Sequence, residues 1–324
     1  MSSIDAKGRL YIDNSTLVSV AQCSTKAVMR YGLGYTTTGG SGAAEVGTVI
    51  HNALERFHKG QPPSECIAAA LPDYRSLVPD TDRDRLLWGN VRAILEAWFA
   101  RFPTLEHLPY STKPDLVEIG FAQPLDAEGM IILCGRIDVV GILRDNQKWY
   151  VIDHKTTYKV DSIWLSQFQM CSQMSGYVWA AQQQLSGQVA GAIINAIEVS
   201  ILPTSTRRCS RHAVPYNECS PQHLKAQFDL ASRSQAMLEE WRKSALHLAR
   251  RFLDLMERFG RRDRVGKLRT QGVFCEGCRW CEFAPWCASG RKEEQIPALF
   301  EHKPWEPYDH AFPDRPEESE PEGE

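Results

Sequence analysis

Apolar positions in the first third of the chain recur with the period of a helix. Between residues 44 and 59 they are Val46, Val49, Ile50, Ala53, Leu54 and Phe57. This spacing places side chains on one helical face. Similar patterns predict helices at 14–31, 65–71 and 82–101. In the helix at 44–59, His51 and Glu55 are four residues apart and therefore share a face.

The pattern then changes to segments rich in β-branched residues and separated by turn-forming residues. Strands are predicted at 116–122, 130–143, 148–154 and 191–201. The first three follow one another closely and predict a meander. Helices are predicted at 163–184 and 221–259. This order predicts an α/β fold, with a small mixed sheet of four or five strands flanked by helices.

Length and composition fit this fold, because 324 residues with 43% hydrophobic content can bury a substantial core. The sequence has no run near the roughly 18 apolar residues of a membrane span. The opening residues, MSSIDAKGRLYIDNS, lack the apolar block of a secretory signal. We therefore expect a cytoplasmic protein with no membrane partner.

Charge is distributed unevenly along the chain. The net charge is -3, yet residues 292–324 hold 11 acidic and 3 basic residues, so the rest of the chain is mildly basic. The Pro- and Glu-rich end from Lys303 is predicted to be disordered or loosely docked. The basic segments 207–212 and 242–269 are candidates for phosphate contacts, although each also suits a solvated surface.

Four of the ten cysteines lie within thirteen residues. They are Cys275, Cys278, Cys281 and Cys287. Without an export signal, such density indicates metal ligands rather than disulfides. The spacing suits either a four-cysteine zinc site or three ligands of an iron-sulfur cluster whose fourth ligand lies elsewhere.

Two acidic residues and a lysine provide the sharpest chemical signal. Asp138 ends Gly-Arg-Ile-Asp on one predicted strand, and Asp153 and Lys155 lie in Val-Ile-Asp-His-Lys-Thr on the next. Residues two apart on a strand share a face, and the hairpin can bring Asp138 alongside. Paired carboxylates favour a cation, and hard oxygen ligands suit Mg²⁺ or Mn²⁺. Such a site can hydrolyse phosphodiesters, whereas an isolated Asp-x-Lys is more often a surface ion pair.

The context of these residues resembles the paired motifs of the PD-(D/E)xK nuclease superfamily, in particular its RecB-like branch. Upstream, Gly-Thr-Val-Ile-His-Asn-Ala-Leu-Glu at 47–55 is similar to the helical motif of that family, which implies that His51 is a metal ligand. Downstream, Gln173 and Tyr177 resemble its Q-x-x-x-Y motif, which contacts DNA and helps orient the lysine. The resemblance also implies a metal contact from the backbone carbonyl of His154.

The sequence departs from the family pattern in two small ways. No proline precedes Asp138, and Asp153 stands where many members have glutamate. Aspartate is common in this branch, so we expect an active site.

The cysteines resemble those of RecB-like nucleases that carry an iron-sulfur cluster. In these proteins a C-x2-C-x5-C segment is joined by a distant N-terminal cysteine, which implies Cys278, Cys281, Cys287 and Cys23 as ligands of a [4Fe-4S] cluster. Cys275 is an alternative fourth ligand, and Zn²⁺ is the alternative cofactor. The cluster would join the helical N- and C-terminal parts to a restriction-endonuclease-like core.

These resemblances imply a metal-dependent nuclease that acts on DNA. We expect an exonuclease working on single-stranded ends in recombination, repair, phage DNA metabolism or CRISPR adaptation, with recombination or CRISPR proteins as partners. A non-catalytic DNA-binding scaffold, a structure-specific endonuclease and an RNase stay open as alternatives. The expected parts are an N-terminal helical segment (1–43), a nuclease core (44–205) with a helical insertion (about 62–112), a C-terminal helical region with the cysteines (206–290) and an acidic tail (291–324).

Overall fold

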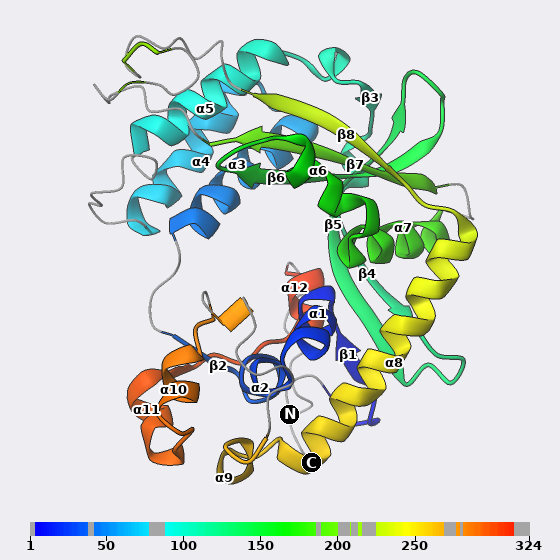
Figure 1. Ribbon diagram of the computed structural model, residues 1–324. Coiled ribbons are helices and arrows are strands. Elements are labelled where there is room, and N and C mark those ends of the chain that lie inside the picture. The colour runs from blue at the N-terminus through cyan, green and yellow to red at the C-terminus, as the bar shows by residue number, and fades with distance from the viewer. Residues whose placement is uncertain are drawn as a thin grey trace, which may run out of the picture. The chain divides into compact units, whose positions relative to one another are not determined.

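The computed structural model divides the chain into two compact units (Figure 1). It describes residues 4–37, 42–77, 88–185, 189–199, 208, 213–215, 225–268, 277–278 and 281–313. Unit 1 comprises Met1–Thr38, Gly120–Arg136 and Glu239–Glu324, and unit 2 comprises Gly39–Ile119 and Ile137–Leu238. The expected core at 44–205 therefore differs from unit 2, which excludes residues 120–136 and continues to Leu238.

Unit 2 is built on a mixed sheet. Its strands are β3 (Tyr110–Ser111), the C-terminal part of β5 (Ile131–Leu143), β6 (Trp149–Thr157), β7 (Val189–Glu198) and β8 (Ala226–Ser232). β5 runs antiparallel to β3 and to β6, β6 is parallel to β7, and β7 is antiparallel to β8. The parallel pair requires a crossover, which the helical segment between β6 and β7 supplies.

Helices surround this sheet. They are α3 (Gly42–His58), α4 (Pro63–Leu77), α5 (Trp88–Arg101), α6 (Ser162–Ser166) and α7 (Ser172–Gln184). Figure 1 shows α3, α4 and α5 gathered beside β6, β7 and β8. Leu54 of α3 and Trp98 of α5 share an apolar core with Ile152 and Ile193 of the sheet. Burial of such side chains contributes about 1.5–3 kcal/mol each, which fixes α3 against β6.

Unit 1 combines segments from both ends of the chain with the middle. Its elements are β1 (Leu10–Ile12), α1 (Asn14–Gln22), α2 (Ser24–Lys26), β2 (Tyr35–Thr36), most of β4 (Val117–Pro124), the N-terminal part of β5, most of α8 (Gln235–Phe259), α9 (Arg262–Val265), α10 (Ala284–Ala288), α11 (Ile296–Leu299), β9 (Glu301–His302) and α12 (Pro307–Ala311). A π-helix, Ala27–Gly32, follows α2. β1 runs parallel to β5, and β2 is antiparallel to β9.

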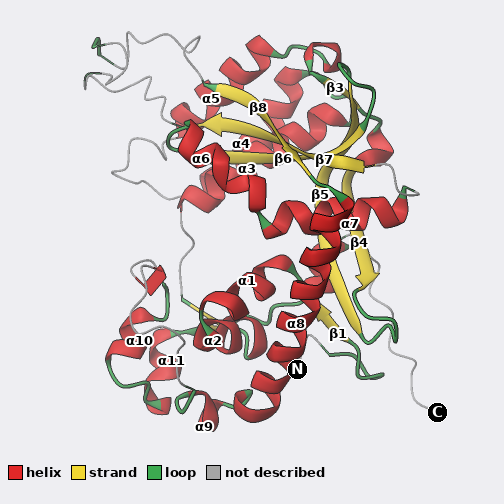
Figure 2. Ribbon diagram, turned by 45° about the vertical axis from the view of Figure 1, so that its right-hand side comes forward, coloured by secondary structure: helices red, strands yellow, loops and turns green. Residues whose placement is uncertain are grey.

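α8 is the longest of the described helices (Figure 2), and its apolar residues lie along one face. Ala245, Ala249, Phe252 and Met256 are buried on that face, while charged residues occupy the remaining faces. Within the described parts of the chain, none of the helices combines the length and apolar character that crossing a membrane requires.

The predicted fold class is confirmed, since helices flank a central mixed sheet, but the predicted strand count is wrong. The described strands form one seven-stranded and one two-stranded sheet, because β1, β3 and β8 join the expected strands. The helix predicted at 221–259 begins only at Gln235, and residues 226–232 instead pair with β7.

Two predicted helices are interrupted, each at a cysteine. The segment 14–31 breaks at Cys23, whose backbone is extended (φ -157°, ψ 107°). The segment 163–184 breaks at Cys171, between a 3-10 turn (Gln167–Met170) and α7. At both breaks the extended backbone of the cysteine changes the direction of the chain.

The chain end also differs from its expected disorder. Residues 291–313 form a 3-10 turn, α11, β9 and α12, and both Phe300 and Ala311 are buried. Aromatic residues explain the difference: Trp305 donates a hydrogen bond from Nε1 to Asp13 (3.2 Å), and Tyr308 packs edge-on against Tyr11. Apolar side chains spaced among the prolines and glutamates therefore bury enough surface to order this segment.

Candidate active site and cysteine group

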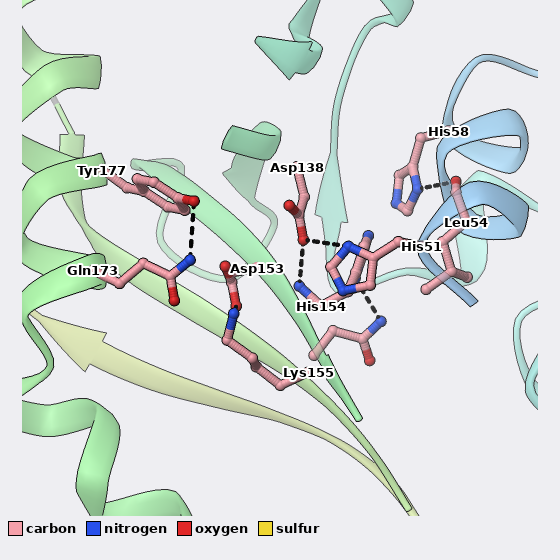
Figure 3. Close-up of polar contacts among 10 residues, drawn as sticks. His51, Leu54, His58, Asp138, Asp153, His154, Lys155, Gln173 and Tyr177 are labelled. Carbon is pink, nitrogen blue, oxygen red and sulfur yellow. Dashed lines mark hydrogen bonds and ion pairs between the residues drawn. The ribbon is translucent and has the colours of Figure 1, made fainter. Parts of the chain in front are cut away.

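His51 and Asp138 meet where α3 packs on the sheet of unit 2. His51 Nδ1 lies 3.3 Å from Asp138 Oδ2, and the backbone N–H of His154 donates to the same oxygen at 2.8 Å (Figure 3). Asp138 is only 9% exposed. One carboxylate oxygen is thus held by a helix and by the neighbouring strand, which leaves this side chain little rotational freedom.

Asp153 and Lys155 form the second part of the site. Lys155 Nζ lies 2.7 Å from Asp153 Oδ2, and Asp153 is almost fully buried. Burial raises the pKa of Asp153 to about 6, helped by the Asp138 carboxylate and opposed by Lys155. Burial also disfavours the charged form of Lys155, but the two carboxylates outweigh it and raise the pKa of the amine. Lys155 is therefore a cation beside two carboxyl groups.

Strand register explains why the two carboxyl groups converge. β5 pairs with β6 from Ile142 opposite Trp149 to Val139 opposite Ile152. Asp138 and Asp153 are each the next residue beyond that last pair, so they come to the same end of the paired stretch. Successive side chains on a strand alternate between faces, which places Asp153 and Lys155 on one face of β6 and the ring of His154 on the other.

Gln173 and Tyr177 lie on the first two turns of α7. Gln173 Nε2 donates to the Tyr177 hydroxyl at 2.9 Å, and Figure 3 shows the Gln173 side chain pointing toward Asp153 and Lys155. Cys171, which precedes α7, interacts electrostatically with Lys155. The start of α7 therefore lies beside the lysine, as the motif order implied.

A buried network behind the site was not predicted from the sequence. His58 Nδ1 donates to the Leu54 carbonyl (2.6 Å), and its Nε2 accepts from the Tyr110 hydroxyl (2.9 Å). Burial lowers the pKa of His58 to about 4, so the ring is neutral. One signal was available, because His58 follows His51 by seven residues, which is two helical turns on the same face.

The ring of His154 belongs to the same network. Its centroid lies 5.7 Å from that of His51 and 5.2 Å from that of His58. The Asn195 amide donates to Nδ1 at 2.9 Å, so the ring proton is on Nε2, a buried atom with no hydrogen-bond partner in the described structure. Burial holds the pKa of His154 well below its usual value. A neutral ring thus fixes the residue whose backbone N–H holds Asp138.

The donor chemistry of this site suits a hard divalent cation. Two carboxylates and an imidazole, with a neighbouring carbonyl, are ligands that Mg²⁺ and Mn²⁺ accept. Within the described ranges, no three His, Cys, Asp or Glu side chains are already grouped to hold a metal ion. The reason is that Asp138 is bonded to His51 and to the backbone N–H of His154, while Asp153 is paired with Lys155. Cation binding would exchange some of these contacts.

Unit 1 brings cysteines from both ends of the chain together. Cys23 lies at the extended break between α1 and α2, Cys281 precedes α10, and Cys287 lies within it. The thiols of Cys281 and Cys287 each interact electrostatically with Cys23. Burial raises the pKa of both, so the thiolate forms need a compensating cation or cluster.

Cys278 lies next to Cys281, because its carbonyl accepts a hydrogen bond from the Cys281 N–H at 3.2 Å. Cys275 lies outside the described residues. Among the described residues, no three cysteine thiols lie close enough together to hold a metal ion. Thiols are nevertheless the soft donors that an iron-sulfur cluster or zinc prefers.

The basic segments carry mixed evidence for phosphate contacts. Along 242–269, Arg258 pairs with Asp254 and Arg262 with Glu293, so part of that positive charge is already matched. Of the run at 207–212, only Arg208 lies within the described residues, where it is exposed.

Comparison with known proteins places the chain in a family. The family model for the PD-(D/E)XK nuclease superfamily matches residues 14–288. The matched range contains His51, Asp138, Asp153, Lys155, Gln173 and Tyr177, together with Cys23 and the C-terminal cysteines. No curated protein matches the chain.

Proposed function

The chain belongs to the PD-(D/E)XK nuclease superfamily, and from this membership we propose that it is a divalent-metal-dependent deoxyribonuclease with its active site at Asp138, Asp153 and Lys155. Proteins of this superfamily are generally nucleases that use Mg²⁺ or Mn²⁺. The observation that carries the proposal is the convergence of His51, Asp138, Asp153 and Lys155 from α3, β5 and β6. A scaffold that had lost catalysis would be expected to lack one of them.

The metal would be held by His51, Asp138 and Asp153, with the backbone carbonyl of His154 as a further ligand. When bound, Mg²⁺ or Mn²⁺ supplies positive charge for the phosphoryl oxygens and lowers the pKa of the attacking water. His51 must then present an unprotonated nitrogen. The His154 N–H keeps Asp138 in one rotamer throughout, so the carboxylate is pre-positioned.

Lys155 orients the attacking water and stabilises charge on the phosphate as the phosphorus–oxygen bond to the leaving group breaks. Its raised pKa keeps it protonated at neutral pH, which favours the second role. Gln173, bonded to Tyr177, limits the positions open to the lysine and offers its remaining polar groups to the DNA backbone.

The finer activity in this proposal is exonucleolytic cleavage of single-stranded DNA ends, in recombination, repair, phage DNA metabolism or CRISPR adaptation. Family resemblance to the RecB-like branch supports this choice over a structure-specific endonuclease. DNA is the substrate, and proteins of those pathways are the partners.

In unit 1, we propose that Cys23, Cys278, Cys281 and Cys287 would hold a [4Fe-4S] cluster, which would have a structural role. The electrostatic coupling of Cys23 to Cys281 and Cys287 supports this assignment. Anaerobically purified protein should be brown and absorb near about 400 nm, a property of such clusters. Colourless protein with one bound zinc would show that the cofactor is Zn²⁺ and not an iron-sulfur cluster. Substituting Cys23 and Cys275 one at a time would identify the fourth ligand.

The deciding experiment is cleavage of end-labelled single- and double-stranded DNA with Mg²⁺ or Mn²⁺, with EDTA as the metal-free control. Wild-type protein should degrade DNA, and Lys155→Ala should lose about 10³-fold in rate. Lys59→Ala is a matched control, because Lys59 also pairs with a carboxylate, that of Glu55, but is largely exposed. Binding without cleavage by folded wild-type protein would instead support the scaffold alternative.

A further inference from the structure

Apolar side chains are unusually exposed on the segment that joins Lys155 to Gln173. Ile163 is 82% exposed and Met170 is 81% exposed, the two highest values among large apolar residues of the described chain. Single exposed apolar residues are common on protein surfaces. These two, however, lie within eight residues of each other, and Tyr158 and Leu230 nearby are also exposed. We call these four residues the apolar rim.

The rim lies beside the candidate active site. Met170 immediately precedes Cys171, which interacts electrostatically with Lys155, and Gln173 follows two residues later. Tyr158 is three residues beyond Lys155, directly after β6 ends. Leu230 of β8 is tied to the same place, because its carbonyl accepts from Gln169 Nε2 at 3.0 Å. The rim residues therefore belong to segments that border Lys155 and Gln173.

A buried arginine holds the rim in place. Arg233 is 5% exposed, and its Nη2 donates to the carbonyls of Phe168 (2.8 Å) and Cys171 (3.4 Å), on either side of Met170. Its Nε donates to Ser175 Oγ in α7 at 2.9 Å. Burying a guanidinium without a carboxylate partner is costly. This clamp keeps the turn before α7 rigid and thereby presents Met170 in a defined direction.

Ile163 is presented by a second anchored element. Asp161 caps α6 by accepting from the Trp164 N–H at 2.9 Å, and Trp164 packs edge-on against the buried Phe168 at 4.9 Å. The exposed side chain is thus fixed by the burial of its neighbours. Several exposed apolar side chains gathered next to a candidate site, unlike a single one, suggest a contact surface.

We infer that the apolar rim packs against the faces of unpaired bases next to the scissile phosphate, and so selects a DNA strand whose bases are not stacked in a duplex. Bases in a duplex have their faces covered by neighbours, whereas a single strand or a frayed end offers them. The inference rests on the proposed nuclease function and refines its substrate class. The bases that contact the rim belong to the same DNA strand as the phosphate at Lys155.

The test uses the double variant Ile163→Gln/Met170→Gln, whose polar side chains keep comparable length. Met130→Gln is the matched control, because Met130 is an exposed methionine of unit 1. Each protein is titrated, with EDTA present to prevent cleavage, into a single-stranded oligonucleotide that carries 2-aminopurine, a base whose fluorescence rises when it is unstacked. Wild type and control should raise the fluorescence. The double variant should bind about tenfold more weakly with little rise.

Steady-state cleavage gives an independent readout. In the double variant we expect KM for single-stranded DNA to rise about tenfold with kcat little changed, because the rim acts on binding rather than on the reacting phosphate. If wild type cleaves DNA and the double variant matches it in fluorescence and KM, the rim inference is overturned and the nuclease function stands. If wild type and the Met130→Gln control unstack the base, the double variant does not, and none of them cleaves DNA, the nuclease function fails and the rim stands.

Two further results would also overturn the inference. One is wild-type protein that does not bind the oligonucleotide at all. The other is self-association of the wild type in sedimentation that the double variant loses, because a second copy of this chain would then cover the rim.

Discussion

The two candidate metal-binding groups differ in how their ligands are brought together. In unit 2, Asp138 and Asp153 are adjacent because two neighbouring strands pair in one register, and His51 is added by a helix packed on that sheet. In unit 1, Cys23 meets Cys281 and Cys287 only because distant segments dock on each other. The first site is a product of the fold, whereas the second group depends on docking between distant segments. Under the proposed function, loss of the metal should remove activity in unit 2 and stability in unit 1.

The largest effect should come from removing one charge in unit 2. Asp138→Asn keeps an oxygen that can accept from the His154 N–H but lowers the affinity for a cation, so cleavage should fall about 10³-fold. The free energy of unfolding should change by less than about 1 kcal/mol, since one of two neighbouring carboxylates has been neutralised. Cleavage assays and urea denaturation measure both. A large loss of stability would show that this site, too, is structural.

The next effect should appear in unit 1 through packing alone. Phe300 is buried and packs on Phe283 at 5.0 Å, and the indole of Trp286 lies edge-on to it. Phe300→Ala should lower the free energy of unfolding of unit 1 by about 3 kcal/mol and weaken retention of the proposed cluster. The adjacent Leu299 is 40% exposed, so Leu299→Ala should cost under about 0.5 kcal/mol. Equal effects of the two substitutions on chemical denaturation would contradict this account.

The stability of unit 2 should depend on pH because of His58, a buried histidine of that unit. Its folded pKa of about 4 lies below the ordinary value of 6.5, so below pH 6.5 the unfolded state takes up a proton first, and stability falls until about pH 4. The loss amounts to about 3 kcal/mol. The stability difference between wild type and His58→Gln should shrink by that amount over this range. His107→Gln, at an exposed histidine, is the matched control for the substitution itself.

The smallest effect concerns the N-terminal helix of unit 1. Asp13 caps α1 by accepting from the N–H and the hydroxyl of Thr16, and it also accepts from Trp305. Asp13→Ala should cost about 1 kcal/mol, while Asp13→Asn should keep most of the stability. Thermal unfolding of the two variants tests this. No loss in either would mean that the hydrogen bonds to Asp13, including that from Trp305, add little to the stability of unit 1.

The hairpin that carries Asp138, Asp153 and Lys155 was predicted from local patterning, whereas His51 was assigned to the site through the family resemblance. The structure brings the four side chains together. The contact of His154 with Asn195 and that of His58 with Tyr110 could not be foreseen in this way, since they join elements that are far apart in the sequence.

The fold predictions failed where a tertiary contact decided the local structure. Residues 226–232 suit a helix by composition, but their backbone groups pair with β7, and β-propensity depends on such partners. The extended break at Cys23 likewise has no proline or glycine to announce it. Proline and glutamate suggested disorder after residue 291, although Phe300 and Trp305 supplied enough apolar surface to dock the segment.

The pairing of β2 with β9 has a consequence for biosynthesis. Tyr35 and Thr36 leave the ribosome early, but their partners His302 and Glu301 are made near the end. Unit 2 is complete by Leu238, so it can fold while translation continues. Unit 1 must wait for its last segment, and until then Cys23 has no cysteine partner from α10. A premature stop after Leu238 would thus leave a folded unit 2 beside an incomplete unit 1 whose Cys23 lacks that partner.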